Sequence, residues 1–146
     1  MKLASGVSVD TENGWISFPE SVSVIARLEG QLVLVSQRRP NFGSQTLELP
    51  GGKIESDEST IAAAHRELAE EAGLKGQKAT VHLSLDMDHS ASFHRTHLIE
   101  VFGVTETGTS YELEREVVNM AQARELVLNG KITHAPTVVA ILGFLK

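Results

Sequence analysis

Residues 51–74 read GGKIESDESTIAAAHRELAEEAGL, in which a glycine pair, Gly51-Gly52, is expected to form a loop and is followed by an acidic turn and a segment with helical periodicity. At about 100° per residue, Glu67 and Glu71 lie one helical turn apart, and Glu70 points to an adjoining part of the same surface. A solvated acidic face would explain a charge run, but it requires neither the preceding glycines nor an arginine between the carboxylates. Mg²⁺ prefers carboxylate and carbonyl oxygens and keeps waters for a phosphate substrate. The stretch therefore predicts a divalent-metal site.

The same stretch predicts one amphipathic helix that begins near Ser59. Apolar residues recur at helical spacing and are expected to face the core, and Gly73 is expected to cap the C-terminus. This stripe consists of Ile61, Ala64, Leu68 and Ala72. The carboxylates lie off the stripe.

The spacing of these residues resembles the Nudix box. Its pattern is G, five residues, E, seven residues, R-E, an aliphatic residue, any residue, E-E, any residue, G and an aliphatic residue. Every fixed position is met, by Gly52, Glu58, Arg66, Glu67, Leu68, Glu70, Glu71, Gly73 and Leu74. The resemblance implies an α/β fold, an α-β-α sandwich with a mixed sheet, the box helix on one side and the C-terminal helix on the other. It also implies an enzyme that hydrolyses a nucleoside diphosphate linked to another moiety, and so a nucleotide as the substrate.

The resemblance assigns roles within the box. Glu67 and Glu71 resemble the main metal ligands, and Glu70 is either a further ligand or the residue that positions the attacking water. The carbonyl of Gly51 or Gly52 would complete the set around Mg²⁺, or around Mn²⁺ as an alternative. Arg66 and Glu58 are expected to give structural support through a bidentate ion pair. A bound metal would polarise the phosphates and activate water.

In members of this family the general base often lies outside the box. The candidates here are Glu112, Glu114 and Glu116, which follow a flexible stretch at 105–110. Glu112 and Glu114 are predicted, with Glu70, to be catalytic. An ordinary solvated acidic loop is the alternative interpretation.

Segments outside the box bear on the substrate. Residues 37–40, 48–52 and 130–135 resemble the ADP-ribose pyrophosphatase branch and favour ADP-ribose or a related nucleotide sugar. Arg39 is expected to bind a phosphate, and Glu48 to accept a hydrogen bond from a hydroxyl or an adenine amine. That branch usually has alanine at the position of Gly51.

Two alternatives stay open. The segment 51–55 is close to the MutT-like branch, which hydrolyses nucleoside triphosphates. A non-catalytic module that binds a nucleotide is the other alternative, but such modules commonly lose box carboxylates, and here all are kept.

The rest of the chain supplies the scaffold. Glu29-Gly30 is a hairpin signal between two runs rich in Val, Ile and Leu, at 21–28 and 31–37, which are expected to pair antiparallel. Further strands are predicted at 46–49, 80–85, 97–104 and 117–120, and helices at 121–128 and 136–145. The side chains expected to point inward from 80–85 and 136–145 are Val81, Leu83, Leu85, Val138, Ile141, Leu142 and Leu145.

Composition sets the class of protein. The length of 146 residues, 41% of them hydrophobic, predicts a single domain over 1–146 with one core. The absence of cysteine excludes disulfides and thiolate catalysis, and no run is apolar enough to span a membrane, so a cytoplasmic location is expected. A net charge of −6 argues against nonspecific nucleic-acid binding. We expect no nucleic-acid or membrane partner, and a homodimer is compatible with the sequence.

A histidine cluster allows a second metal hypothesis. His89, His94 and His97 lie in one polar segment, 86–96 and its border, with Asp86 nearby. Their spacing fits no ligand pattern, so a pocket-lining role is the preferred interpretation.

Overall fold

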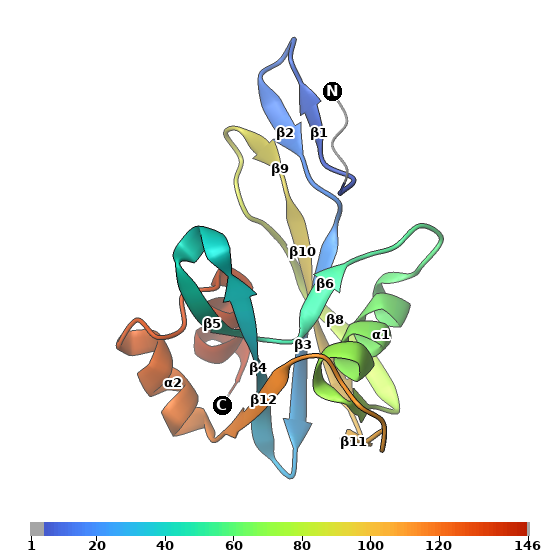
Figure 1. Cartoon of the computed structure of the whole chain (residues 1–146), viewed down its shortest axis with the longest axis vertical. Coiled ribbons are helices and arrows are strands. Elements are labelled where there is room, and N and C mark those ends of the chain that lie inside the picture. The colour runs from blue at the N-terminus through green and yellow to red at the C-terminus, as the bar shows by residue number, and fades with distance from the viewer. Residues whose placement is uncertain (1–4, 146) are drawn as a thin grey trace.

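A mixed sheet separates two helical layers in the computed structural model, which describes residues 5–145 (Figure 1). The strand order is β12-β4-β3-β10-β8, with β5 added on β4 and β6 on β3. Within this seven-stranded sheet β10 and β3 run parallel, and the other pairs are antiparallel. The seven strands are β3 (Ser21–Leu28), β4 (Gln31–Arg39), β5 (Ser44–Glu48), β6 (Gly51–Lys53), β8 (Lys78–Asp86), β10 (Arg95–Phe102) and β12 (Glu114–Val118).

The predicted hairpin joins β3 to β4, and the two strands separate close to the turn. Glu29 and Gly30 both have positive φ, 51° and 81°, as a type I′ turn requires. Only the pairs Arg27–Leu32 and Leu28–Gln31 follow before the strands separate. Beyond that point β3 pairs with β6, and β4 pairs with β5. The two halves of the hairpin thus lead into different parts of the sheet.

The separation changes one expectation about the box. Gly51 and Gly52 were expected in a loop, but they lie in β6, opposite Ser23 and Val22 of β3. Their lack of side chains allows this close pairing, because a Cβ on Gly51 would lie 2.1 Å from the Val22 carbonyl oxygen.

The box helix α1 (Thr60–Ala72) has the predicted ends. The Ser59 side chain accepts a hydrogen bond from the Ala62 N–H, and Gly73 adopts the left-handed conformation with φ 66°. Ala64, Leu68 and Ala72 are buried against β3, β4 and β10, as the stripe predicted. This helix covers one face of the sheet.

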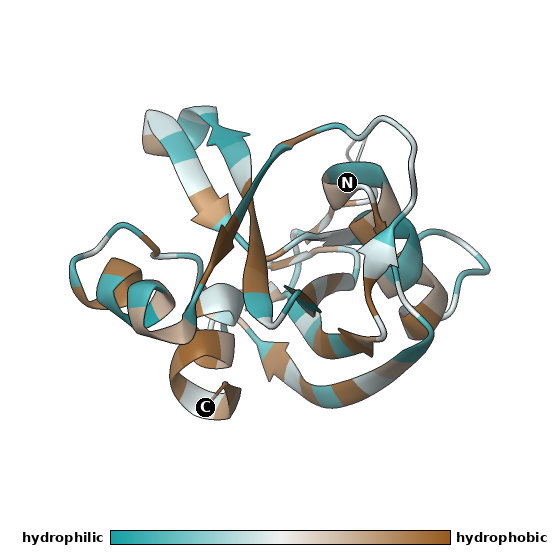
Figure 2. Ribbon diagram, turned by 90° about the horizontal axis from the view of Figure 1, so that it is seen from below, coloured by the Kyte–Doolittle hydropathy of each residue, from teal (hydrophilic) through white to brown (hydrophobic). Residues whose placement is uncertain are grey.

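The other face is covered by α2 (Met120–Leu128), α3 (Ala135–Val139) and a π turn (Ala140–Phe144). The hydrophobic strands lie between the two helical layers, as Figure 2 shows in brown. Asn119 caps α2 with a capping box completed by Gln122. The predicted α-β-α sandwich, with the box helix on one side and the C-terminal helix on the other, is confirmed.

Two predicted core positions are wrong. Val81 is exposed because a bulge in β8 breaks the alternation: Leu98 of β10 pairs with Leu83, and the next residue, Ile99, pairs with Val81. Leu142 is exposed because Ala140 and Ile141 are the residues that face the sheet, and the π turn brings Leu145 back to it.

Short elements complete the chain. β1 (Ser8–Asp10), β2 (Trp15–Ser17) and β9 (Ser92–Phe93) form a small sheet that projects from the main one (Figure 1). β7 (Leu74–Lys75) pairs with β11 (Thr105–Glu106), and a 3-10 turn spans Pro40–Phe42. No helix within residues 5–145 is long and apolar enough to cross a membrane.

Candidate active site

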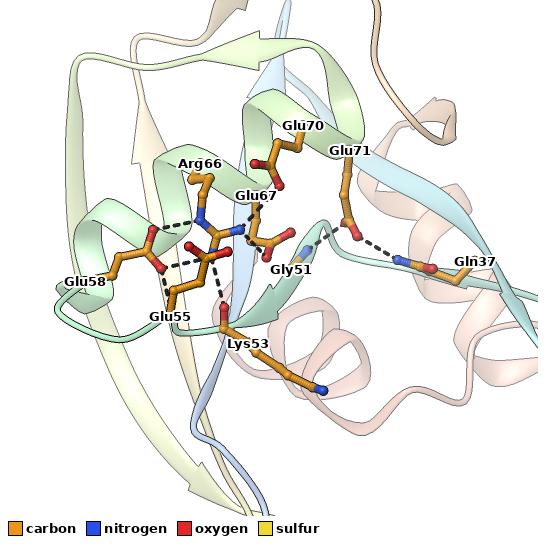
Figure 3. A network of polar contacts seen from close by, with 9 residues as sticks. All are labelled: Gln37, Gly51, Lys53, Glu55, Glu58, Arg66, Glu67, Glu70 and Glu71. Atoms are coloured by element: carbon orange, nitrogen blue, oxygen red, sulfur yellow. Dashed lines mark hydrogen bonds and ion pairs between the residues drawn. The ribbon is translucent and has the colours of Figure 1, made fainter. Parts of the chain in front are cut away.

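The box carboxylates lie along one side of α1, facing β6 (Figure 3). Glu67 and Glu71 are buried, whereas the side chain of Glu70 is 46% exposed. Burial raises the pKa of the Glu67 carboxyl above its usual value, and it raises that of Glu71 to about 7. Burial thus disfavours the charged form of both carboxylates, which lie one helical turn apart.

Arg66 ties this side of the helix to the box loop. Its Nε and Nη2 donate to Glu58 Oε1 and Oε2 at 2.7 and 2.9 Å, which is the predicted bidentate pair. Nη1 donates to Glu67 Oε1 at 2.7 Å and to Glu70 Oε2 at 3.3 Å, and Nη2 also donates to the Lys53 carbonyl oxygen at 2.9 Å. This pairing lowers the pKa of Glu58 to about 2. One guanidinium therefore fixes the loop carboxylate and orients two box carboxylates.

Glu71 is held from the opposite direction. Its Oε2 accepts the Gly51 N–H at 2.9 Å, and its Oε1 accepts a hydrogen bond from Gln37 Nε2 at 2.8 Å. Sequence reasoning missed Gln37. The signal that points to it is the period of β4, in which Val33, Val35 and Gln37 share the face toward α1.

Because Gly52 has no side chain, the backbone of β6 can lie directly against the Glu67 carboxylate. A Cβ on Gly52 would lie 2.3 Å from Glu67 Oε1, so any larger residue would displace the carboxylate. Glu67, Glu70 and Glu71, beside the close backbone of β6, offer the kind of oxygen donors that a small divalent cation prefers. Within the described range, no three acidic or histidine side chains already converge on one point. The carboxylates are oriented by Arg66, Gln37 and Gly51.

Arg39 and Glu48 were expected to meet the substrate separately, but they bind each other. Arg39 Nε and Nη2 donate to Glu48 Oε2 and Oε1 at 3.0 and 2.8 Å, and Thr46 donates a further hydrogen bond to Oε2. Glu48 is 4% exposed and Arg39 44%. Both oxygens of Glu48 thus already accept hydrogen bonds within the protein, and Glu48 is better described as the anchor of Arg39. The negative charge of Glu71 contributes to raising the pKa of Arg39, after the larger effect of Glu48, so the guanidinium lies on the box side of the molecule.

The three acidic candidates outside the box separate. The backbone N–H of Glu112 donates to the Glu70 carbonyl oxygen at 2.9 Å, and the charge of Glu112 helps to raise the pKa values of Glu67 and Glu71. Glu114 and Glu116 instead lie in β12, opposite Ser36 and Leu34, on the sheet face toward α2. The structure brings Glu112 to the box and leaves Glu114 on the other side of the sheet, because the strand begins earlier than the predicted residue 117.

The histidine cluster does not assemble either. His97 bonds Glu20 and Ser84 at 2.6 and 2.7 Å, His94 contacts the Phe18 ring, and the His89 side chain is 83% exposed. The three imidazoles thus have separate partners.

A cavity of about 900 Å³ adjoins the box. Arg66 and Glu67 form part of its lining, together with Phe18, Lys53 and Ile54. Its volume lies within the range of pockets that bind small molecules and cofactors.

Known proteins resemble this chain over more than half of its length. A model described as the NUDIX domain matches residues 17–135. The chain is 45% identical over 87 residues to an ADP-sugar pyrophosphatase of Mus musculus, covering 56% of this chain and 40% of that protein. It is 28% identical over 137 residues to an ADP-ribose pyrophosphatase of Bacillus subtilis (strain 168), covering 86% of this chain and 72% of that protein.

A solved structure of an ADP compounds hydrolase has the same fold. Its TM-score is 0.75 at 22% sequence identity, and the superposition covers 84% of this chain and 68% of that chain. The match to the mouse protein spans less than half of that protein's length.

Proposed function

The chain belongs to the Nudix family, and we propose that it is a divalent-metal-dependent hydrolase that acts on ADP-ribose or a related nucleotide sugar. Water would add across the pyrophosphate linkage, and a nucleoside monophosphate and a sugar phosphate would leave. The observation that carries the proposal is the pair of buried carboxylates, Glu67 and Glu71, held against the glycine backbone of β6.

The same pair supports a divalent cation, Mg²⁺ or Mn²⁺, as the cofactor. Glu67, Glu71 and Glu70 would hold it, with the carbonyl of Gly51 or Gly52 as a further donor. When bound, such an ion supplies charge stabilisation at the phosphates and lowers the pKa of water. Arg66 keeps Glu67 and Glu70 oriented before the ion arrives, because it already donates to both.

Glu112 is the proposed general base. Its segment is fixed to the end of α1 by the hydrogen bonds to the Glu70 and Glu71 carbonyl oxygens, at 2.9 and 3.3 Å from the N–H groups of Glu112 and Leu113. Its carboxylate is exposed and lies near enough to influence Glu67 and Glu71. In this position it would accept the proton from the attacking water.

Arg39 is the proposed phosphate-binding residue. Because Glu48 takes one edge of the guanidinium, the group is fixed in direction, while 44% of the side chain stays exposed to a ligand. The similarity to the mouse ADP-sugar pyrophosphatase and the bacterial ADP-ribose pyrophosphatase supports a nucleotide sugar as the substrate.

Steady-state kinetics on a panel of substrates tests the proposal. The panel consists of ADP-ribose, other nucleotide sugars, dinucleoside polyphosphates and nucleoside triphosphates, each with Mg²⁺ and with Mn²⁺. We expect the largest kcat/KM for ADP-ribose or another nucleotide sugar. A larger value for the triphosphates would assign the chain to the MutT-like branch.

A further inference from the structure

His134 contacts the buried end of the Arg39–Glu48 pair from the other helical layer. It precedes α3, and its Nε2 lies 3.5 Å from Glu48 Oε1. Its Nδ1 lies 2.8 Å from the hydroxyl oxygen of Thr137, which is completely buried. The sequence interpretation included this segment but gave His134 no role.

Thr137 and Glu48 together favour the tautomer of His134 that carries its proton on Nε2. The Thr137 hydroxyl oxygen accepts the Leu49 N–H at 2.9 Å, so its own proton is free to point at Nδ1 of His134. Nδ1 is then the acceptor and Nε2–H faces the Glu48 carboxylate. The opposite tautomer would place a lone pair against that carboxylate. Burial lowers the pKa of His134, which favours the neutral ring.

Glu48 is therefore contacted on two sides by donors from different elements. Arg39 and Thr46 hold it from β4 and β5, and His134 approaches from the start of α3. Because Arg39 Nε and Nη2 both donate to this carboxylate, its orientation sets the direction of the half-exposed guanidinium.

We propose that His134 is a positioning residue, which uses its Nε2–H to fix Glu48 and thereby the direction in which Arg39 presents its guanidinium. Thr137 acts with it by holding the tautomer. The effect on substrate binding rests on the proposed function, in which Arg39 binds a phosphate. The effect on Arg39 itself does not.

Nuclear magnetic resonance of the substrate-free, metal-free protein tests the part that is independent of activity. We expect the Nε2–H tautomer of His134 at neutral pH and a distinct Arg39 Nε–H signal. His134→Leu should shift the Arg39 signal toward that of a solvent-exposed arginine. His134→Gln should preserve it, because its amide can donate toward Glu48 from nearly the same place. His89→Leu, at an exposed site, is the matched control.

Kinetics tests the consequence for the substrate. His134→Leu should raise KM for ADP-ribose roughly ten-fold and change kcat by less than about two-fold, whereas His134→Gln should restore KM to within about three-fold. In a double-mutant cycle, His134→Leu should add little to the KM of Arg39→Ala, since both act through one group.

The outcomes are separable. If Arg39 keeps its signal in His134→Leu, or if His134 has the Nδ1–H tautomer, the positioning role is wrong whatever the enzyme hydrolyses. If the signals change as expected but no nucleotide sugar is cleaved, the proposed substrate is wrong and the positioning role stands. If His134→Leu does not fold, His134→Asn replaces it, because asparagine can reach Thr137 but is too short to reach Glu48.

Discussion

The Gln37 side chain donates a 2.8 Å hydrogen bond to Glu71, which joins β4 to the box helix across 34 residues of sequence. Glu71 has only one other donor, the Gly51 N–H, among the hydrogen bonds of the described chain. Gln37 thus supplies one of the two hydrogen bonds that fix Glu71, the box carboxylate whose pKa burial raises to about 7.

Replacing Gln37 by alanine should therefore lower activity without unfolding the protein. A lost hydrogen bond to a charged group costs roughly 1.5–3 kcal/mol, and we expect kcat to fall about ten-fold or more. Gln31→Ala is the control, because Gln31 begins the same strand but is exposed. Equal kcat in the two variants would show that Gln37 does not orient Glu71.

Glu71→Gln should abolish metal-dependent turnover while leaving the fold intact. The substitution keeps the volume but removes the charge of a proposed ligand, so kcat should fall by orders of magnitude. Chelation of divalent metal should likewise abolish the turnover of the parent enzyme. Added Mg²⁺ should restore turnover in the parent but not in Glu71→Gln. Turnover of the variant in chelator would contradict the metal site.

The stability of the metal-free protein should depend on pH through Glu71. Burial raises its pKa in the folded protein to about 7, well above the ordinary value of a glutamate, so binding of the proton favours the folded state. This contribution is complete below about pH 4.5 and is lost as the pH rises toward 7 and above, by up to about 3 kcal/mol. Thermal unfolding in chelator should show Tm falling over this range, and Glu71→Gln should flatten the fall. A parallel fall in both proteins would assign the effect to other groups.

Arg39→Ala should act mainly on substrate affinity. Loss of a charge-assisted contact should raise KM for ADP-ribose by roughly ten-fold to a hundred-fold, with a smaller change in kcat. Arg38→Ala provides the matched control, since Arg38 is exposed. As the residue before Arg39 in β4, it points to the opposite face of the sheet. If both variants have the parent KM, Arg39 does not bind the substrate.

The two acidic candidates outside the box should differ in the same assay. Glu112→Gln should lower kcat by about 10²-fold to 10⁴-fold, the usual contribution of a general base. Glu114→Gln should retain nearly full activity, because Glu114 lies on the sheet face toward α2. The reverse result would overturn the assignment of Glu112.

Local patterns predicted the elements that depend on nearby residues. The strand Ser21–Leu28 is found where the run rich in Val, Ile and Leu placed it, and the helix Thr60–Ala72 where the helical period and the Gly73 cap placed it. Contacts between distant segments were not predictable in this way. The bulge that exposes Val81 depends on the register with β10, and the strand that removes Glu114 from the box depends on pairing with β4.

The site shows the same division. The pair Arg66–Glu58 was implied by the resemblance to the Nudix box, since both residues belong to one continuous motif, and the structure contains it. Gln37 and His134 were missed because their partners, Glu71 and Glu48, come from other parts of the chain. Glu48 was given a substrate role because its burial and its pairing with Arg39 exist only in the folded protein.

Because β3 and β4 separate close to their turn, the site consists of two parts. One part consists of β3, β6 and the box carboxylates beside them, and the other consists of β4 and β5 with Arg39. The two parts are joined by the two residue pairs next to the Glu29-Gly30 turn, and the Gln37–Glu71 hydrogen bond links them again at the site. The Glu29-Gly30 turn joins the strand beside the proposed metal ligands to the strand that carries Arg39, so we expect an insertion there to alter the site without changing any residue in it.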